Sequence, residues 1–160
     1  MASSHRPLTT APGLVRLLNP LTRSLLRRGM PLGPNTLITV RGRRTGEPHT
    51  FPVAVSEIDR RLWVISPYGE VNWVRNLRSA GGAVLKRNGG HQPVRAVELS
   101  PDEARYFYAD RLARYVRSLP LVGRGFARVF LPLAGARAML DDPTTAAQRF
   151  PVFELIEQAA

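Results

Sequence analysis

The alternation of apolar and polar positions predicts a series of β-strands through the middle of the chain. Short runs of β-branched and aromatic residues recur there, bounded by Gly, Pro, Asn and Asp, which is typical of strands joined by turns. The six predicted strands are TLITVR (36–41), HTFPVAV (49–55), LWVIS (62–66), AVLKRN (83–88), PVRAVEL (93–99) and the closing run RFPVFELI (149–156).

Helical signals occur at three other places. Residues 19–29 and 71–80 predict short helices, the first beginning at an Asn-Pro pair and ending at a Gly. The third helix, over 100–118, begins at Ser100, which is followed by Pro and, at the capping-box position, by Glu103. Its apolar positions fall on one face, so we expect it to pack on the sheet.

Consecutive strands with helices early and late in the chain favour an α+β fold with a barrel-like antiparallel sheet. The length of 160 residues suits a single domain over 1–160. Within it we expect a loose polar arm (1–12), the core strands (36–99), a helical region (100–145) and the closing strand.

The positive charge is concentrated in the first part of the chain. The net charge is +11, and residues 1–50 contribute +7 of it, from eight arginines against Glu47. Residues 51–95 add +4, and the remainder carries eight basic and eight acidic side chains. Such a field favours an anionic partner, namely nucleic acid, membrane lipid, or a phosphorylated or polycarboxylate ligand.

Several classes of function lack support. The chain has no cysteine and only three scattered histidines, so we expect no metal site. Aromatic residues are few, at 8%, and mostly occupy core positions, which argues against nucleic acid. No leader or spanning segment is evident, and we expect a cytoplasmic protein. Peripheral membrane contact through the basic residues 13–29 is the alternative.

The first candidate binding element is the turn Gly42-Arg43-Arg44-Thr45-Gly46, which His49 follows three residues later. Glycines let the backbone approach an oxyanion closely, and guanidinium groups match phosphate or carboxylate with two parallel hydrogen bonds. Taken alone, the same turn also suits a solvated hairpin end.

The second candidate element is the strand end Ser66-Pro67-Tyr68-Gly69, which leads into the predicted helix over 71–80. The start of a helix favours an anion, and the ring of Trp73 offers a flat apolar surface. Trp73 and Leu77 lie four residues apart, so packing of this helix on the core explains them equally well. Asn76 lies between them, and a half-buried amide needs hydrogen-bonding partners.

In order and spacing, five segments resemble the deazaflavin-dependent nitroreductase family: NPLTRSLLRRG, TVRGRRTGEPHTFPV, WVISPYG, NWVRNL and RFPVFEL. The resemblance covers residues 18–99 well and the last strand moderately. It implies a six-stranded, mostly antiparallel split β-barrel of the FMN-binding type with flanking helices. It also implies an enzyme that uses coenzyme F-420 to transfer hydride to a small organic acceptor.

The resemblance also implies which residues contact the cofactor. Arg43, Arg44, Thr45 and Gly46 match the turn that holds the phosphate and oligoglutamate tail, and His49 stands where the family often has Arg. Pro52 and the 66–69 loop match positions near the deazaflavin ring. The full implied set is Arg43, Arg44, Thr45, Gly46, His49, Pro52, Ser66, Pro67, Tyr68, Gly69, Trp73, Asn76 and Leu77.

Tyrosines are the candidate proton donors or substrate-orienting groups, namely Tyr68, Tyr106, Tyr108 and Tyr115. The helical region would form a lid over a small-molecule acceptor, with quinone, nitroaromatic, enone and imine all open. A split-barrel oxidoreductase using FMN is one alternative. A non-catalytic cofactor carrier or membrane-surface protein is another. A monomer and a homodimer both remain compatible with the sequence.

Overall fold

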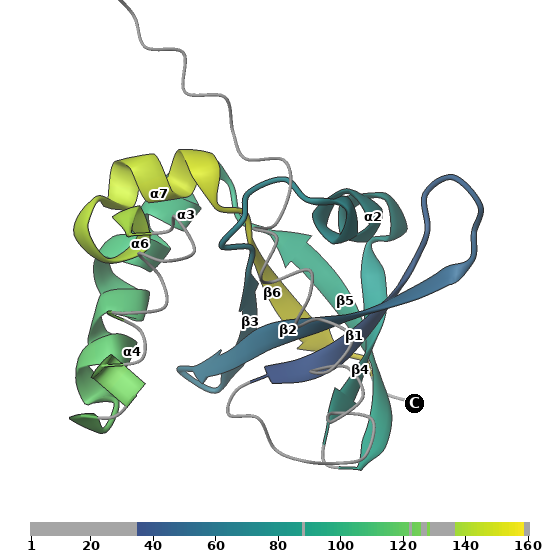
Figure 1. The fold of residues 1–160 in the computed structure, drawn as a ribbon, viewed down its shortest axis with the longest axis horizontal. Coiled ribbons are helices and arrows are strands. Elements are labelled where there is room, and N and C mark those ends of the chain that lie inside the picture. Colours follow the sequence, from purple (N-terminus) through teal and green to yellow (C-terminus); the bar gives the residue numbers. More distant parts are fainter. Residues whose placement is uncertain (1–34, 88, 122, 126–127, 129–136, 159–160) are drawn as a thin grey trace, which may run out of the picture.

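Six antiparallel strands form a closed barrel, as the sequence predicts (Figure 1). The computed structural model describes residues 35–87, 89–121, 123–125, 128 and 137–158. The order of the strands around the barrel is β1-β2-β3-β6-β5-β4, and β4 pairs with β1 to close it. The strands are β1 (Asn35–Arg41), β2 (Pro48–Ile58), β3 (Arg61–Ile65), β4 (Gly82–Arg87), β5 (Gly90–Glu98) and β6 (Val152–Glu157).

One helix, α2 (Asn72–Ala80), joins β3 to β4 and lies at one end of the barrel (Figure 1). Val74 and Leu77 on α2 are buried against the barrel interior, and Gly81 ends the helix in the left-handed conformation with its N–H bonded to the Leu77 carbonyl. Glycine suits this position because it has no Cβ to clash.

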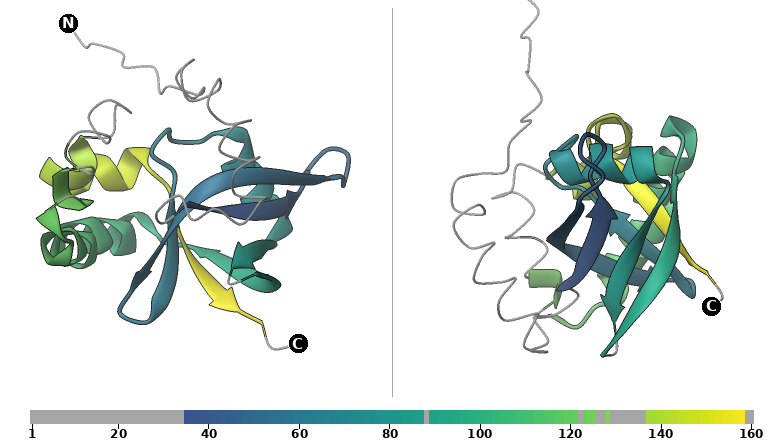
Figure 2. Two further views of the ribbon diagram at one scale, coloured as in Figure 1. Left: turned by 60° about the horizontal axis from the view of Figure 1, so that its bottom comes forward. Right: turned by 90° about the vertical axis from the view of Figure 1, so that its right-hand side faces the viewer.

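The remaining helices lie together on one side of the barrel (Figures 1 and 2). The predicted helix from Pro101 to Ser118 is present with its capping box, but its central turn is a π-helix. Two shorter helices follow later in the chain. These elements are α3 (Pro101–Tyr106), η1 (Phe107–Leu112), α4 (Ala113–Ser118), α6 (Ala138–Asp141) and α7 (Pro143–Arg149).

Two apolar cores result from this arrangement. The first fills the barrel and includes Ile38, Val64 and Leu85. The second lies between the helices and the sheet, where Trp63 packs on Phe107 with ring centroids 4.8 Å apart. Side chains alternate across a strand, so adjacent residues of β3 serve both cores.

Strand β2 changes partner along its length. Its second half, from Val55 to Ile58, pairs with β3, whereas residues 48–54 pair with β1. Within the described residues, the other edge of this first half has no strand partner. Pro52 lies in this half, where its missing N–H breaks no ladder bond to β3.

The predicted arm over 1–12, the helix over 19–29 and the basic segment 13–29 lie outside the described residues. Within the described part of the chain, no helix is long and apolar enough to cross a membrane.

Candidate functional site

The turn between β1 and β2 is a tight loop that projects from the barrel on the side of α2 (Figure 1). The N–H of Gly42 donates to the Glu47 carbonyl at 2.8 Å, and the N–H of Gly46 donates to the Gly42 carbonyl at 2.9 Å. Gly46 has a φ of +74°, which glycine adopts without strain. The hydroxyl of Thr45 accepts from the Glu47 N–H at 3.3 Å, so Thr45 shapes the turn.

Arg43 is held against α2 by neutral amides. Its Nη1 donates to Oδ1 of Asn76 at 2.8 Å, its backbone N–H donates to the same oxygen at 3.4 Å, and its Nη2 reaches Oδ1 of Asn72 at 3.5 Å. Asn76 is only 6% exposed, so its buried amide needs partners, and these bonds provide them. An amide orients a guanidinium without cancelling its charge, so Arg43 keeps a full positive charge.

Arg44 adds a second charge beside it. Arg44 is exposed, and within the described residues it forms no hydrogen bond or ion pair. The ion pairs of the described chain lie elsewhere, on Arg61, Arg78, Arg87, Arg111, Arg114 and Arg137. The turn therefore presents two uncompensated guanidinium groups, which is a donor set suited to phosphate or carboxylate oxygens.

His49 lies at the base of the same turn. A Cβ placed on Gly42 would lie 2.8 Å from the imidazole ring of His49, so the ring packs directly over the Gly42 backbone. The ring of Phe51 is 6.3 Å away on the same face of β2. His49 therefore lies beside the turn that carries Arg43 and Arg44.

The exposed part of α2 contains Asn72, and Trp73 is partly buried. The Trp73 ring packs against the barrel core, with its centroid 6.4 Å from that of Phe153. Leu77 differs from the expectation, because it is 0% exposed inside the barrel and has no surface to offer a ligand. Its side chain anchors α2 to the barrel core. Asn72 was not singled out in the sequence, since nothing local distinguishes it from a solvated asparagine.

The loop after β3 has its own internal bonds. The buried hydroxyl of Ser66 donates to the Gly69 carbonyl at 2.6 Å, and Gly69, with φ +73°, returns its N–H to Ser66 at 3.2 Å. Ser66 is thus occupied in shaping the loop. Pro67 and Tyr68 are partly buried, and burial raises the pKa of the Tyr68 phenol, so Tyr68 stays protonated at neutral pH.

The other three tyrosines considered from the sequence as proton donors lie on the helical side of the barrel. Tyr108 is 2% exposed in the second core, and its hydroxyl donates to the Phe150 carbonyl at 2.8 Å. Burial raises its pKa strongly, so the group is a buried structural donor, which corrects the expectation of a catalytic role. Tyr115 is half-buried against the same core. Tyr106 is 58% exposed on α3.

The fold belongs to a recognisable class. A proposed 5-nitroimidazole antibiotic resistance protein from Bacteroides thetaiotaomicron is similar with a TM-score of 0.50 and 8% identity, over 86% of this chain and 80% of its own. An F-420-H2 dependent reductase has a TM-score of 0.48 and 16% identity, over 76% and 93%. A pyridoxamine 5'-phosphate oxidase-related FMN-binding protein from Nostoc punctiforme has a TM-score of 0.49 and 14% identity, over 94% and 82%. At 8% identity, the likeness to the first of these structures extends to the fold alone.

The described structure therefore defines a split-barrel protein with an exposed pair of uncompensated arginines at one end. Residues 22–118 match the family described as F-420-H(2)-dependent quinone reductase. This match covers more than half of the chain, and the chain belongs to that family. It is an F-420-dependent reductase whose cofactor is coenzyme F-420. No curated protein sequence matches the chain significantly.

The residues present fit that cofactor. F-420 carries a phosphodiester and several carboxylates, and Arg43 and Arg44 are free of carboxylate partners within the described chain. Gly46 leaves the backbone of the same turn open, since no atom of the described residues lies within 4 Å of a Cβ built on it. For the ring system, Trp73 offers an apolar face at the neighbouring helix.

Proposed function

We propose that this protein reduces a quinone with reduced F-420, binding the cofactor at the barrel end formed by the β1–β2 turn, α2 and the loop after β3. The observation that carries the proposal is the arrangement of Arg43, which two asparagine amides orient without neutralising it. A guanidinium held in this way is preorganised for an anion. The family description supports quinone among the acceptors.

In this proposal the turn holds the anionic tail of the cofactor. Arg43 and Arg44 bind its phosphate and carboxylate oxygens, while Thr45 and Gly46 keep the turn in shape. His49 supports the turn from the adjacent strand. Asn76 acts through Arg43, because its single amide oxygen is already occupied by that side chain.

The ring system would lie beyond the tail, against the half-buried Trp73, Pro52 and the loop of Ser66 to Gly69. Reduced F-420 supplies hydride when bound. Reduction of a quinone to a hydroquinone consumes one hydride and one proton. The hydroxyl of Tyr68 donates that proton and regains one from solvent, and its raised pKa keeps it protonated until then.

The test is an acceptor comparison under matched conditions. Purified protein and reduced F-420 are mixed with a short-chain naphthoquinone, a nitroaromatic, an enone or a cyclic imine, and the return of oxidised F-420 is followed by its absorbance. The proposal predicts the largest kcat/KM for the quinone. Faster turnover of another class would replace quinone as the acceptor, and turnover with reduced FMN but not F-420 would contradict the cofactor assignment.

A further inference from the structure

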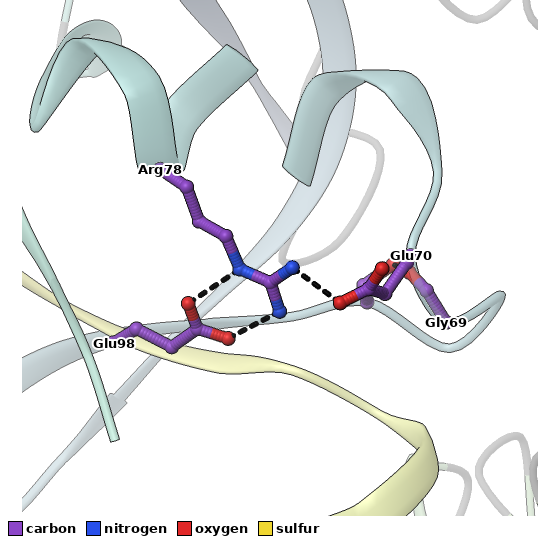
Figure 3. A network of polar contacts seen from close by, with 5 residues as sticks. Gly69, Glu70, Arg78 and Glu98 are labelled. Atoms are coloured by element: carbon purple, nitrogen blue, oxygen red, sulfur yellow. Dashed lines mark hydrogen bonds and ion pairs between the residues drawn. The ribbon is translucent and has the colours of Figure 1, made fainter. Parts of the chain in front are cut away.

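Three segments at the cofactor end of the barrel meet on a single side chain, Arg78 of α2 (Figure 3). Its Nε and Nη2 each donate to one carboxylate oxygen of Glu98 at 2.6 Å, which makes a two-pronged contact with the end of β5. Its Nη1 donates to Glu70, in the loop that follows β3. One guanidinium thus joins α2, the loop and the sheet.

The opposite charges of this cluster stabilise one another in their ionised forms. The hydrogen bond from Arg78 lowers the pKa of Glu70, and the positive charge of Arg75 acts in the same direction. Glu70 therefore stays ionised well below neutral pH. Arg78 also occupies the last turn of α2, where the helix dipole favours a cation.

Other bonds also hold the loop: the N–H of Arg75, in the first turn of α2, donates to the Val71 carbonyl at 3.3 Å, and the N–H of Ser66 donates to the Pro151 carbonyl at 3.0 Å. The loop's internal bonds join Ser66 to Gly69, and the N–H of Val71 donates to the Gly69 carbonyl at 2.9 Å. These bonds fix the shape of the loop and its junction with the first turn of α2, but none of them reaches the last turn of the helix. The contact between Glu70 and Arg78 reaches from the loop to the far end of α2, which is two turns beyond Val71.

We propose that Arg78 is a positioning residue for the reaction: by holding Glu70 and Glu98 together it sets the spacing between the Tyr68 loop and α2. The inference rests on the proposed function, in which those two elements flank the deazaflavin ring. Among the described residues, the guanidinium of Arg78 bonds to Glu70 and Glu98 and not to the β1–β2 turn, where the proposed function places the cofactor tail. Its loss should therefore misplace the ring and the proton donor while leaving the tail contacts in place.

The partial exposure of the cluster supports a geometric role rather than a stabilising one. The side chain of Arg78 is 36% exposed, and ion pairs at such positions contribute little to the free energy of unfolding. Rates respond differently, since a misplacement of about 1 Å between reacting groups lowers a rate by roughly a hundredfold.

The chain offers a matched control. Arg87, with a side chain 33% exposed, likewise joins two carboxylates, Glu57 at 2.6 Å and Glu157 at 3.8 Å. These residues lie toward the C-terminal ends of β4, β2 and β6, which is the barrel end opposite α2. Arg87→Met removes the same kind of cluster from a place where no cofactor contact is proposed.

The experiment compares Arg78→Met, Arg78→Lys and Arg87→Met with the unmodified protein. Amide hydrogen exchange of the cofactor-free protein reports on the loop, and fluorescence titration with F-420 and steady-state kinetics follow. For Arg78→Met we expect about tenfold faster exchange at Gly69 and Val71. We also expect a kcat lowered by about ten- to a hundredfold, with the F-420 Kd changed less than about threefold. Arg78→Lys should recover part of both losses, because an ammonium can hold one carboxylate but not both.

Arg87→Met should match the unmodified protein in loop exchange and in kcat. Unchanged exchange and kcat in Arg78→Met, in a protein that binds and oxidises reduced F-420, would overturn the inference alone. An equal fall in kcat for both methionine variants would also overturn it, since it would indicate general destabilisation. If the unmodified protein fails to bind F-420, the proposed function fails, whereas the exchange result still reports whether Arg78 holds the loop.

Discussion

At the scale of single residues, the proposed cofactor binding depends on Arg43 having an amide, and not a carboxylate, as its partner. A carboxylate at position 76 would hold the guanidinium more strongly but would neutralise it. Asn76 instead supplies one oxygen at 2.8 Å and no charge. The positive charge is thereby oriented and left available for an external anion.

This reasoning predicts the effect of Asn76→Asp, which keeps the acceptor oxygen and adds a negative charge. We expect the F-420 affinity to fall about tenfold or more, because the new carboxylate pairs with Arg43, and ion pairing inside a partly buried site is strong. The measurement is a fluorescence titration. Gln148→Glu, on α7, introduces the same charge elsewhere and should bind F-420 as the unmodified protein does. Equal affinities of the two variants would refute this role for Asn76.

Substitutions of Tyr68 and Tyr108 should affect catalysis and stability separately. Tyr68→Phe should lower turnover with the quinone by roughly a hundredfold, as expected when a general acid is removed, with the melting temperature nearly unchanged. Tyr108→Phe should instead lower the free energy of unfolding by about 1–3 kcal/mol, because the buried Phe150 carbonyl loses its donor. Chemical denaturation and steady-state kinetics of both variants check the pair. The reverse pattern would exchange their assignments.

At the scale of elements, the strands were predictable because period-2 patterns and turn residues are local signals. Each of the six runs identified in the sequence became a strand, with ends displaced by a few residues. The cap at Ser100 was equally local and is present with its reciprocal bond to Glu103. The π-turn of 107–112 was not predictable, because it depends on how Phe107 and Leu112 pack against Trp63 and its neighbours.

The connection from α2 to β4 depends on two successive glycines that have different structural roles. Gly81 adopts a φ of +67° to end the helix, and Gly82 passes so close to β5 that a Cβ would lie 2.8 Å from the Val94 carbonyl oxygen. Gly82→Ala should therefore force the two strands apart and lower the free energy of unfolding by about 1–3 kcal/mol.

Gly90→Ala, in the same pair of strands, is the matched control for this variant. Among the described residues, its Cβ would meet only the Arg87 carbonyl oxygen, at 3.7 Å, which is an ordinary contact. Urea denaturation should therefore distinguish the two substitutions. Equal stabilities would mean that the backbone of β5 adjusts at no cost, contrary to the close packing described.

At the scale of the whole molecule, the acidic side chains are distributed unevenly. Of the twelve acidic residues, only Glu47 belongs to the β1–β2 turn, and most of the others pair with arginines or cap helices elsewhere. The β1–β2 turn stood out in the sequence because its arginines are consecutive. The clusters around Arg43 and Arg78 did not, because each includes a partner far along the chain, Asn76 at 33 residues and Glu98 at 20.

An exposed, unpaired charge makes binding sensitive to salt. Raising the ionic strength from about 0.01 M to 0.15 M shortens the screening length from about 30 Å to about 8 Å, so we expect F-420 to bind several-fold more weakly at the higher salt. Riboflavin, which lacks phosphate and carboxylates, is a neutral comparison ligand whose binding, if any, should not change with salt. Titrations at several salt concentrations test this, and a salt-independent F-420 affinity would contradict an electrostatic tail site.

The most direct test of the central claim is a fluorescence titration with F-420 of three proteins: the unmodified chain, Arg43→Gln with Arg44→Gln, and Arg60→Gln with Arg61→Gln. Both double variants remove two adjacent arginines from a hairpin. In the second hairpin Arg60 lies in the turn and Arg61 begins β3, at the opposite end of β2. The account predicts at least about tenfold weaker binding for the first variant and nearly unchanged binding for the second. Equal affinities for all three proteins, or equal losses in both variants, would contradict cofactor binding at the β1–β2 turn.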